Sequence, residues 1–335
     1  MRQFATVVRG IPARVLRILL ASIVTALLVI THSASAQTWP SKPVKLIVGF
    51  GPGGVADITA RVVAQRLSQD LGQQFVVDNR PSAGGIVAAD AVAKAEPDGY
   101  TLLLMSNGNA VSASLFKSLP YDTVADFAPV STLGFFDVAV VTTPDTRIDS
   151  LRGLIARAKA NPGKLNIGTI NVGSTQHLSA ELFKSMAGVD AETVPYKGSP
   201  AVIAALRGKD VEIAFEMLAP IISQAQSGAV RVLAVTSDRR SPLLPDVPTV
   251  AESGVPGYQA SSWNAIAAPA RTPRAIVDRL NQAIGAALAS AEVKSRLEAA
   301  GVTARGSTPE EMRQLVIADI AKWRRVIELA KLEKQ

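Results

Sequence analysis

The chain has 335 residues, of which 48% are hydrophobic, and its 35 Lys and Arg against 28 Asp and Glu give a formal net charge of +7. This composition can bury ordinary cores, which argues against disorder, and its mixed charges form no basic and aromatic stripe of the kind that binds nucleic acid. Because the chain contains no cysteine, disulfides, thiolate catalysis and Cys-ligated metals are excluded.

The first 36 residues have the pattern of a secretory signal peptide. Four arginines precede an uncharged apolar run over residues 18–30, and small residues follow at positions 34–36. This run is shorter than the roughly 20 residues that a membrane-spanning helix needs, so we expect cleavage before Gln37 and export to the periplasm. Because four arginines and no acidic residue leave with this segment, the net charge falls from +7 to +3. The mature chain is therefore mildly basic.

The first part of the mature chain predicts a βαβαβ unit. Short apolar runs occupy residues 44–50, 74–80 and 100–106, and each is typical of a buried strand. Between these runs, apolar residues recur with a period near 3.6 over residues 57–71 and 85–95, which predicts two helices. Strands joined by helices in this way run parallel, so we expect a sheet that is covered on both faces.

A second series of runs predicts a second α/β lobe. Its expected strands lie at 138–144, 164–170, 192–198, 211–217 and 230–237, and its expected helices lie at about 150–160, 175–186 and 201–206. The segment 241–258 is rich in Pro and Gly, which excludes a continuous helix or a central strand and indicates a returning connection. From Arg274 the chain becomes helical, with a long amphipathic segment over 309–332.

Together these elements predict a two-lobed α/β fold with a hinge. We expect the chain to leave the first lobe near Phe136, to build the second lobe and to return near Ser261. The first lobe then comprises residues 37–137 plus 261–335, and the second comprises 138–260. Two interdomain crossovers of this kind leave a cleft between the lobes that can open and close.

The stretch VKLIVGFGPGGVAD, residues 44–57, contains the spacing G-x-G-x-x-G between a predicted strand and a predicted helix, where a dinucleotide fingerprint lies. Asp78, at the end of the next strand, matches the acid that contacts the ribose in such sites. Two observations oppose a nicotinamide cofactor. Pro52 has no N–H to offer a pyrophosphate, and no diffusible nicotinamide pool is expected in the periplasm. We therefore expect no cofactor.

The same turn is better suited to a single carboxylate. It exposes the backbone N–H groups of Gly53, Gly54, Val55 and Ala56 at a helix N-terminus, where partial positive charge attracts an anion. The alternative is a purely structural strand-to-helix turn that is capped by Asp57. The motif alone leaves both interpretations open.

The sequence contains no convincing set of catalytic residues. A secreted hydrolase would need a nucleophile such as Ser174 that is activated by His177, but a separation of three residues in one helix suits such a pair poorly. Ser174 and Thr175 are equally suited to cap that helix, and Asn107 and Asn109 could form a turn with their own backbone. We expect no catalytic residue and no metal site, and the hydrolase remains the alternative.

Several long blocks of the sequence are similar to one family of transport proteins. The blocks VKLIVGFGPGGVADITARVVAQRL, PDGYTLLL, NPGKLNIGT, HLSAELFKSMAG and LAVTSDRRSPLLPDVPTVAESGVPGYQASSW resemble the Bug receptors, which are the substrate-binding components of tripartite tricarboxylate transporters. The resemblance extends from Trp39 to about Trp323. It implies a two-lobed periplasmic binding protein (type II-like) that closes on a small organic acid and delivers it to a membrane permease of a large and a small subunit. We expect a monomer that needs no cofactor and binds no nucleic acid.

The resemblance also implies where the ligand binds. Its carboxylate is expected at the first turn, held by backbone N–H groups and ordered water, with other loops forming the opposite wall. The predicted ligand-binding residues are Phe50, Gly53, Gly54, Val55, Ala56, Asp57, Ser106, Asn107, Asn109, Gly173, Ser174, Thr175, His177, Tyr196, Gly198, Ser199 and Glu216. In a cleft, Glu216 could bond an amine or a hydroxyl of the ligand. Two departures from the family pattern leave the identity of the acid open: GFGPGG replaces PFPPGG, and FEM at 215–217 replaces FDN.

Overall fold

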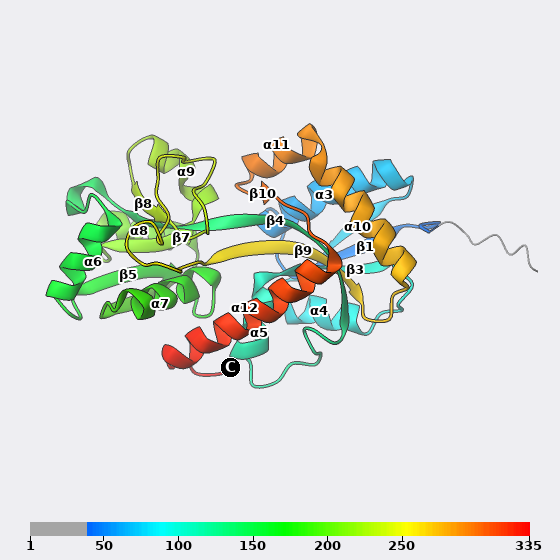
Figure 1. Cartoon of the computed structure of the whole chain (residues 1–335), viewed down its shortest axis with the longest axis horizontal. Coiled ribbons are helices and arrows are strands. Elements are labelled where there is room, and N and C mark those ends of the chain that lie inside the picture. The colour runs from blue at the N-terminus through cyan, green and yellow to red at the C-terminus, as the bar shows by residue number, and fades with distance from the viewer. Residues whose placement is uncertain (1–38) are drawn as a thin grey trace, which may run out of the picture. The chain divides into compact units, whose positions relative to one another are not determined.

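Three parallel strands joined by helices begin the fold, as predicted (Figure 1). The computed structural model describes residues 39–335, so the signal peptide predicted for residues 1–36 lies outside the described residues. The elements of this part are β1 (Val44–Val48), α3 (Val55–Leu71), β2 (Phe75–Asn79), the 3-10 helix η2 (Ala83–Gly85), α4 (Ile86–Ala93), β3 (Thr101–Ser106) and α5 (Asn107–Leu115). β1 lies between β2 and β3 and is buried apart from Lys45, as expected for a strand that is covered on both faces.

The second series of strands and helices also follows the predicted order. Its elements are β4 (Phe127–Thr142), the 3-10 helix η3 (Pro144–Thr146), α6 (Leu151–Ala160), β5 (Leu165–Ile170), α7 (Thr175–Ala187), β6 (Ala191–Tyr196), α8 (Ser199–Gly208), β7 (Ile213–Met217), α9 (Leu218–Gln226) and β8 (Arg231–Val235). β5 pairs in parallel with both β6 and β7. Residues 241–258 form turns and one isolated bridge, between Val235 and Thr249, so this segment is a connection as predicted.

Two long strands, β4 and β9 (Ser261–Pro269), connect the two groups of parallel strands (Figure 1). The strand order is β2-β1-β3-β9-β4-β7-β5-β6, and β9 is antiparallel to both of its neighbours. β4 pairs with β9 through residues 127–137 and with β7 and β8 through residues 138–142. The result is the two-lobed α/β fold with two crossing strands. The limits of the two lobes along the chain stay a prediction.

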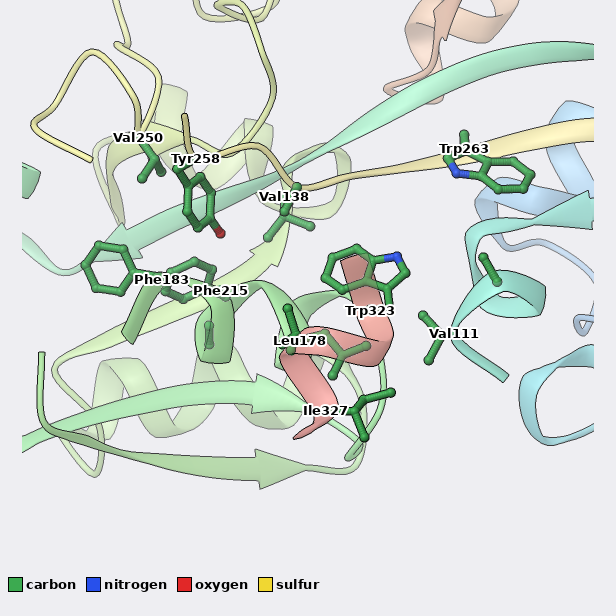
Figure 2. Packing of buried hydrophobic residues seen from close by; sticks show 14 of the residues in the cluster. Val111, Val138, Leu178, Phe183, Phe215, Val250, Tyr258, Trp263, Trp323 and Ile327 are labelled. Carbon is green, nitrogen blue, oxygen red and sulfur yellow. The ribbon is translucent and has the colours of Figure 1, made fainter. Parts of the chain in front are cut away.

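The C-terminal helices pack in two different ways. The remaining elements are α10 (Arg274–Ala289), α11 (Ala291–Ala299), β10 (Thr303–Ala304) and α12 (Pro309–Leu329). α10 and α11 pack against α3 in the first lobe, whereas α12 contacts both α5 and α7 and therefore bridges the two lobes. In Figure 2, Trp323 of α12 lies between Val111 of α5 and Leu178 of α7, within one hydrophobic core that includes residues of both lobes.

Several elements differ from the expectation, and one of them, α9, has no counterpart among the predicted helices. The turn considered for Asn107 and Asn109 is the start of α5, because Ser106 and Asn109 form a capping box there. β4 begins at Phe127, well before the strand predicted from residue 138. Register irregularities after Pro129 and after Thr132 interrupt its regular pairing with β9, and this explains why no simple strand period marks its first half.

Candidate functional site

A cavity of about 650 Å³ lies at the carboxyl ends of the parallel strands and is lined by residues of both lobes. Its apolar wall comprises Phe50, Val111, Leu115, Phe116, Phe136, Ile170, Val172 and Met217. Its polar wall comprises Ser82, Ser106, Ser112, Asn171, Ser174, Thr175, Gln176, Ser199, Ser262, Asn264 and Gln335. None of the described residues that line it is Lys or Arg. The volume is that of a site for a small organic molecule.

The fold brings the predicted loops to this cavity. The predicted residues that line it are Phe50, Gly54, Val55, Ala56, Ser106, Gly173, Ser174, Thr175 and Ser199. The other predicted residues do not line the cavity, but each lies within three positions of a residue that does. They are Gly53, Asp57, Asn107, Asn109, His177, Tyr196, Gly198 and Glu216. Contact between any of these residues and a ligand stays a prediction.

Helices α3, α5, α7 and α8 are among those that begin at the cavity wall. Ser106 caps α5 and Ser174 caps α7, because their hydroxyls accept hydrogen bonds from the N–H groups of Gly108 and His177 at 3.2 and 3.1 Å. The N-caps of α3 and α8 are Gly54 and Gly198, which offer no side-chain cap. Since unpaired N–H groups at a helix start carry partial positive charge, these two ends are suited to an anion.

The carboxylate of Asp57 holds the turn at the start of α3. It accepts hydrogen bonds from the N–H of Gly53, from Arg61 Nε and from Asn79 Nδ2, each at 2.9 Å. Burial raises the pKa of Asp57, but these bonds outweigh burial and hold the pKa below its usual value. Because Arg61 balances its charge, Asp57 opposes an anion at the start of α3 less than a bare carboxylate would. A structural role for Asp57 and a binding role for the turn are therefore compatible.

Asn107 belongs to a buried hydrogen-bond chain between the lobes. Trp323 Nε1 donates to Asn107 Oδ1 at 2.7 Å, and Asn107 Nδ2 donates to the hydroxyl of Thr175 at 2.9 Å. Asn107 is fully buried and its carboxamide is engaged on both sides. Its side chain therefore links α12, α5 and α7 at the edge of the cavity.

Among the described residues, the geometry supports neither a Ser174–His177 catalytic pair nor a dinucleotide site that uses Asp78. The hydroxyl of Ser174 bonds the backbone N–H of His177, not its ring, and the ring Nδ1 lies 3.5 Å from the N–H of Gly173. Burial lowers the pKa of His177, so its ring is neutral near pH 7. Asp78, the residue considered for a ribose contact, forms an ion pair with Arg80 at 2.8 Å and does not line the cavity.

Glu216 is a fully buried acid next to the cavity wall. Its Oε1 accepts hydrogen bonds from Gln176 Nε2 at 3.0 Å and from the N–H of Met217 at 2.8 Å. Burial raises the pKa of Glu216 above its usual value, and these bonds oppose that effect without cancelling it. Both donors belong to residues that line the cavity, so Glu216 supports the wall of the second lobe.

The Glu216→Gln variant should remove a dependence of stability on pH. Because the pKa of Glu216 is raised in the folded state, the folded protein binds more protons than the unfolded chain above about pH 4.5, and its stability falls as the pH rises. Glutamine keeps the acceptor for both donors and cannot ionise. In urea unfolding from pH 4.5 to pH 7.5, the variant should gain stability relative to wild type as the pH rises. Glu328→Gln, at an exposed position of α12, is the control. The prediction would be contradicted if the difference in the free energy of unfolding between wild type and variant stayed constant from pH 4.5 to pH 7.5.

Sequence reasoning missed the contribution of β9 to the cavity. Ser262 and Asn264 line it, and their spacing of two residues places them on one face of the strand. Trp263 points to the other face, where its Nε1–H donates to Asp319 Oδ2 at 2.7 Å. Polar residues at alternate positions of the otherwise apolar run SSWNAIAAP are the signal that identifies them. Other residues of the polar wall that the sequence did not indicate are Ser82, Ser112, Asn171, Gln176 and Gln335.

The fold and the cavity together define the class of the protein, a two-lobed α/β solute-binding protein. Residues 59–332 match the family described as "Tripartite tricarboxylate transporter family receptor". The chain belongs to this family.

Its relatives include a periplasmic binding protein and a protein solved with adipate. The chain is 41% identical to the protein BugT of Bordetella pertussis over 300 residues, which is 89% of this chain and 92% of BugT. An R. palustris protein solved with adipate is 38% identical, with a TM-score of 0.75 over 88% of this chain and 98% of the other. The periplasmic binding protein BugD is 32% identical, with a TM-score of 0.73 over 89% of this chain and 100% of BugD.

Proposed function

We propose that the chain is a periplasmic receptor that captures a small organic acid in the cavity between its lobes and delivers it to a tripartite tricarboxylate transporter. One observation carries this proposal. The start of α3 has no side-chain cap and lies at a cavity whose described lining residues include no Lys or Arg. Unpaired backbone N–H groups at a helix start bind an anion without a cationic side chain. The family and the relative solved with adipate support an organic acid as that anion.

The glycines of the first turn allow the close approach that such binding needs. Gly53 has a φ of 82°, a conformation that residues with a Cβ rarely adopt. A Cβ on Gly54 would meet only the carbonyl oxygen of Gly51, at 3.9 Å, so there is free space beside the first N–H groups of α3. In the proposed complex, the ligand's carboxylate occupies this space and accepts hydrogen bonds from the N–H groups of Val55 and Ala56.

The two lobes contribute complementary parts of the proposed complex. The first lobe holds the carboxylate at α3, and apolar residues of both lobes, among them Phe50, Phe136 and Met217, enclose the body of the ligand. β4 and β9 are the crossing strands about which the lobes close. Enclosure removes the ligand from water, which strengthens the bonds at α3.

Transport, not catalysis, is the proposed outcome of binding. The hydroxyl of Ser174 is used as a helix cap, and this disfavours a secreted hydrolase. Export rests on the signal-peptide pattern of residues 1–36 and on the similarity to the periplasmic binding protein BugD. Within residues 39–335, no helix is both long and apolar enough to cross a bilayer. The proposed partners are the large and small subunits of the membrane permease, to which a monomeric receptor delivers the acid.

Acids should bind to the protein, and their neutral amides should not. We expect a thermal shift at pH 7.5 with at least one of succinate, adipate and 4-hydroxybutanoate, and none with the corresponding full amides at equal concentration. A ligand at 100 times its Kd stabilises the folded state by about 2.7 kcal/mol. The amide lacks the charge that the start of α3 attracts. Equal shifts with an acid and its amide would contradict an anion site.

A further inference from the structure

The carboxamide of Asn264 is buried at the cavity without a hydrogen-bond partner. Asn264 lines the cavity, and its exposed fraction is 0%. Neither its Nδ2 nor its Oδ1 has a hydrogen-bond partner among the described residues. Burial of one unpaired polar atom costs stability, and the burial of both atoms of one carboxamide therefore calls for an explanation. A ligand group that enters the cavity would supply both missing bonds.

The position of Asn264 in the sheet places it within reach of a ligand that is bound at α3. Asn264 pairs with Ser106 across β9 and β3, and β3 is the neighbour of β1, which leads into the glycine turn. Since neighbouring strands lie about 4.8 Å apart, β9 lies about 10 Å from β1. A short-chain molecule can therefore contact both the start of α3 and Asn264.

The polar neighbour across the strand is already engaged. The Ser106 hydroxyl accepts a hydrogen bond from the N–H of Gly108 at 3.2 Å and lies 3.4 Å from Asn109 Oδ1. It therefore serves the capping box of α5. Asn264 is left with an unpaired donor and an unpaired acceptor in the wall of the cavity.

The chemistry of a carboxamide limits the group that satisfies both of its atoms. A carboxylate only accepts hydrogen bonds, so it would pair with Nδ2 and leave Oδ1 unpaired. A hydroxyl or a carboxamide both accepts and donates, so it can pair with both atoms. The second polar group of the ligand is therefore expected to be neutral.

We propose that Asn264 determines the specificity of this receptor and that the ligand is a short monocarboxylate with a hydroxyl or carboxamide as its second polar group. This inference rests on the proposed function, because it requires the carboxylate to lie at α3. It goes beyond that function by choosing among organic acids.

Calorimetry with chain-matched acids tests the inference. For chains of four, five and six carbons, each set compares four end groups opposite the carboxylate: methyl, hydroxymethyl, carboxamide and a second carboxylate. The four-carbon set is butanoate, 4-hydroxybutanoate, succinamate and succinate. For at least one length, wild type should bind the hydroxyl or carboxamide acid at least about tenfold more tightly than both the methyl and the dicarboxylate acids, as expected for a bond to a buried polar group. In Asn264→Leu, this preference over the methyl acid should fall below about twofold.

Thr169→Val is the matched control. The Thr169 hydroxyl is also buried without a hydrogen-bond partner in the described chain, but Thr169 does not line the cavity. Its valine variant should keep the wild-type preference. If Asn264→Leu does not fold, Asn264→Ala adds no bulk and should show the same loss of preference.

The outcomes separate this inference from the function on which it rests. An unchanged preference in a folded Asn264 variant overturns the role of Asn264, and so does tighter binding of the dicarboxylate at every chain length by wild type. Both results leave an acid receptor in place. Failure of every acid in the panel to bind to wild type overturns the proposed function and this inference together.

Discussion

Replacing Trp323 with alanine should lower the free energy of unfolding by about 3–5 kcal/mol, the usual cost of truncating a large buried aromatic residue. The indole has an exposed fraction of 0% and lies between Val111 and Leu178, so its removal leaves space that both lobes border (Figure 2). It also removes the donor of the 2.7 Å hydrogen bond to Asn107 Oδ1 and leaves that buried oxygen unpaired. Urea unfolding of wild type and variant measures the effect.

Two further variants separate packing from hydrogen bonding at this position. Trp323→Phe keeps an aromatic ring but loses the N–H donor, so it should cost less than the alanine variant and at least the roughly 1–3 kcal/mol of an unpaired buried acceptor. Leu329→Ala, at an exposed position of the same helix, should change stability by about 0.5 kcal/mol or less. A Trp323→Ala variant within about 1 kcal/mol of wild type would show that α12 does not anchor the core.

The bridge that α12 makes explains why Asn107 lies at the cavity edge. The chain from Trp323 through Asn107 to Thr175 joins the last helix of the fold to the first turn of α7, a part of the cavity wall. The sequence places Asn107 directly after a strand and Thr175 at the start of a helix, and the structure agrees with both. It cannot indicate that their side chains bond each other, because the pairing depends on how α12 packs between two lobes.

The order of strands and helices was predictable because its signals are local. The apolar runs at β1, β2 and β3 and the helical period of α3 can be recognised within a few residues. The glycine turn after β1 was recognisable as a cavity wall for the same reason. The first half of β4 was not, because its pairing with β9 contains two register irregularities.

The contribution of Asn264 to the wall depends on non-local pairing. β9 lies between β3 and β4, so residues far apart in the chain, Ser106 and Asn264, become neighbours across two strands. A pattern within β9 can suggest which of its faces is polar, but only the strand order shows that this face meets the carboxyl end of β3. Ser112 and Asn171 also line the cavity from different lobes, so their proximity likewise depends on the strand order and not on a local pattern.

The Gly54→Val variant should bind the cognate acid roughly 10- to 150-fold more weakly while keeping its fold. The added side chain enters the free space beside the first N–H groups of α3, where the proposed carboxylate lies. Loss of one charge-assisted hydrogen bond of about 1.5–3 kcal/mol corresponds to that range. The backbone of Gly54 is extended, with φ −79° and ψ 168°, so valine fits without strain. Calorimetry with the acid identified in the panel measures the loss.

Gly51→Val provides the matched control within the same turn. A Cβ at Gly51 meets no atom within 4 Å, and Gly51 does not line the cavity, so this variant should bind the acid as wild type does. Asp78→Ala should also leave binding unchanged, whereas a dinucleotide site would lose affinity through the ribose contact. Circular dichroism and urea unfolding establish that each variant is folded. If folded Gly54→Val binds the acid with wild-type affinity, the start of α3 does not hold the carboxylate, and the glycine turn serves only to join β1 to α3.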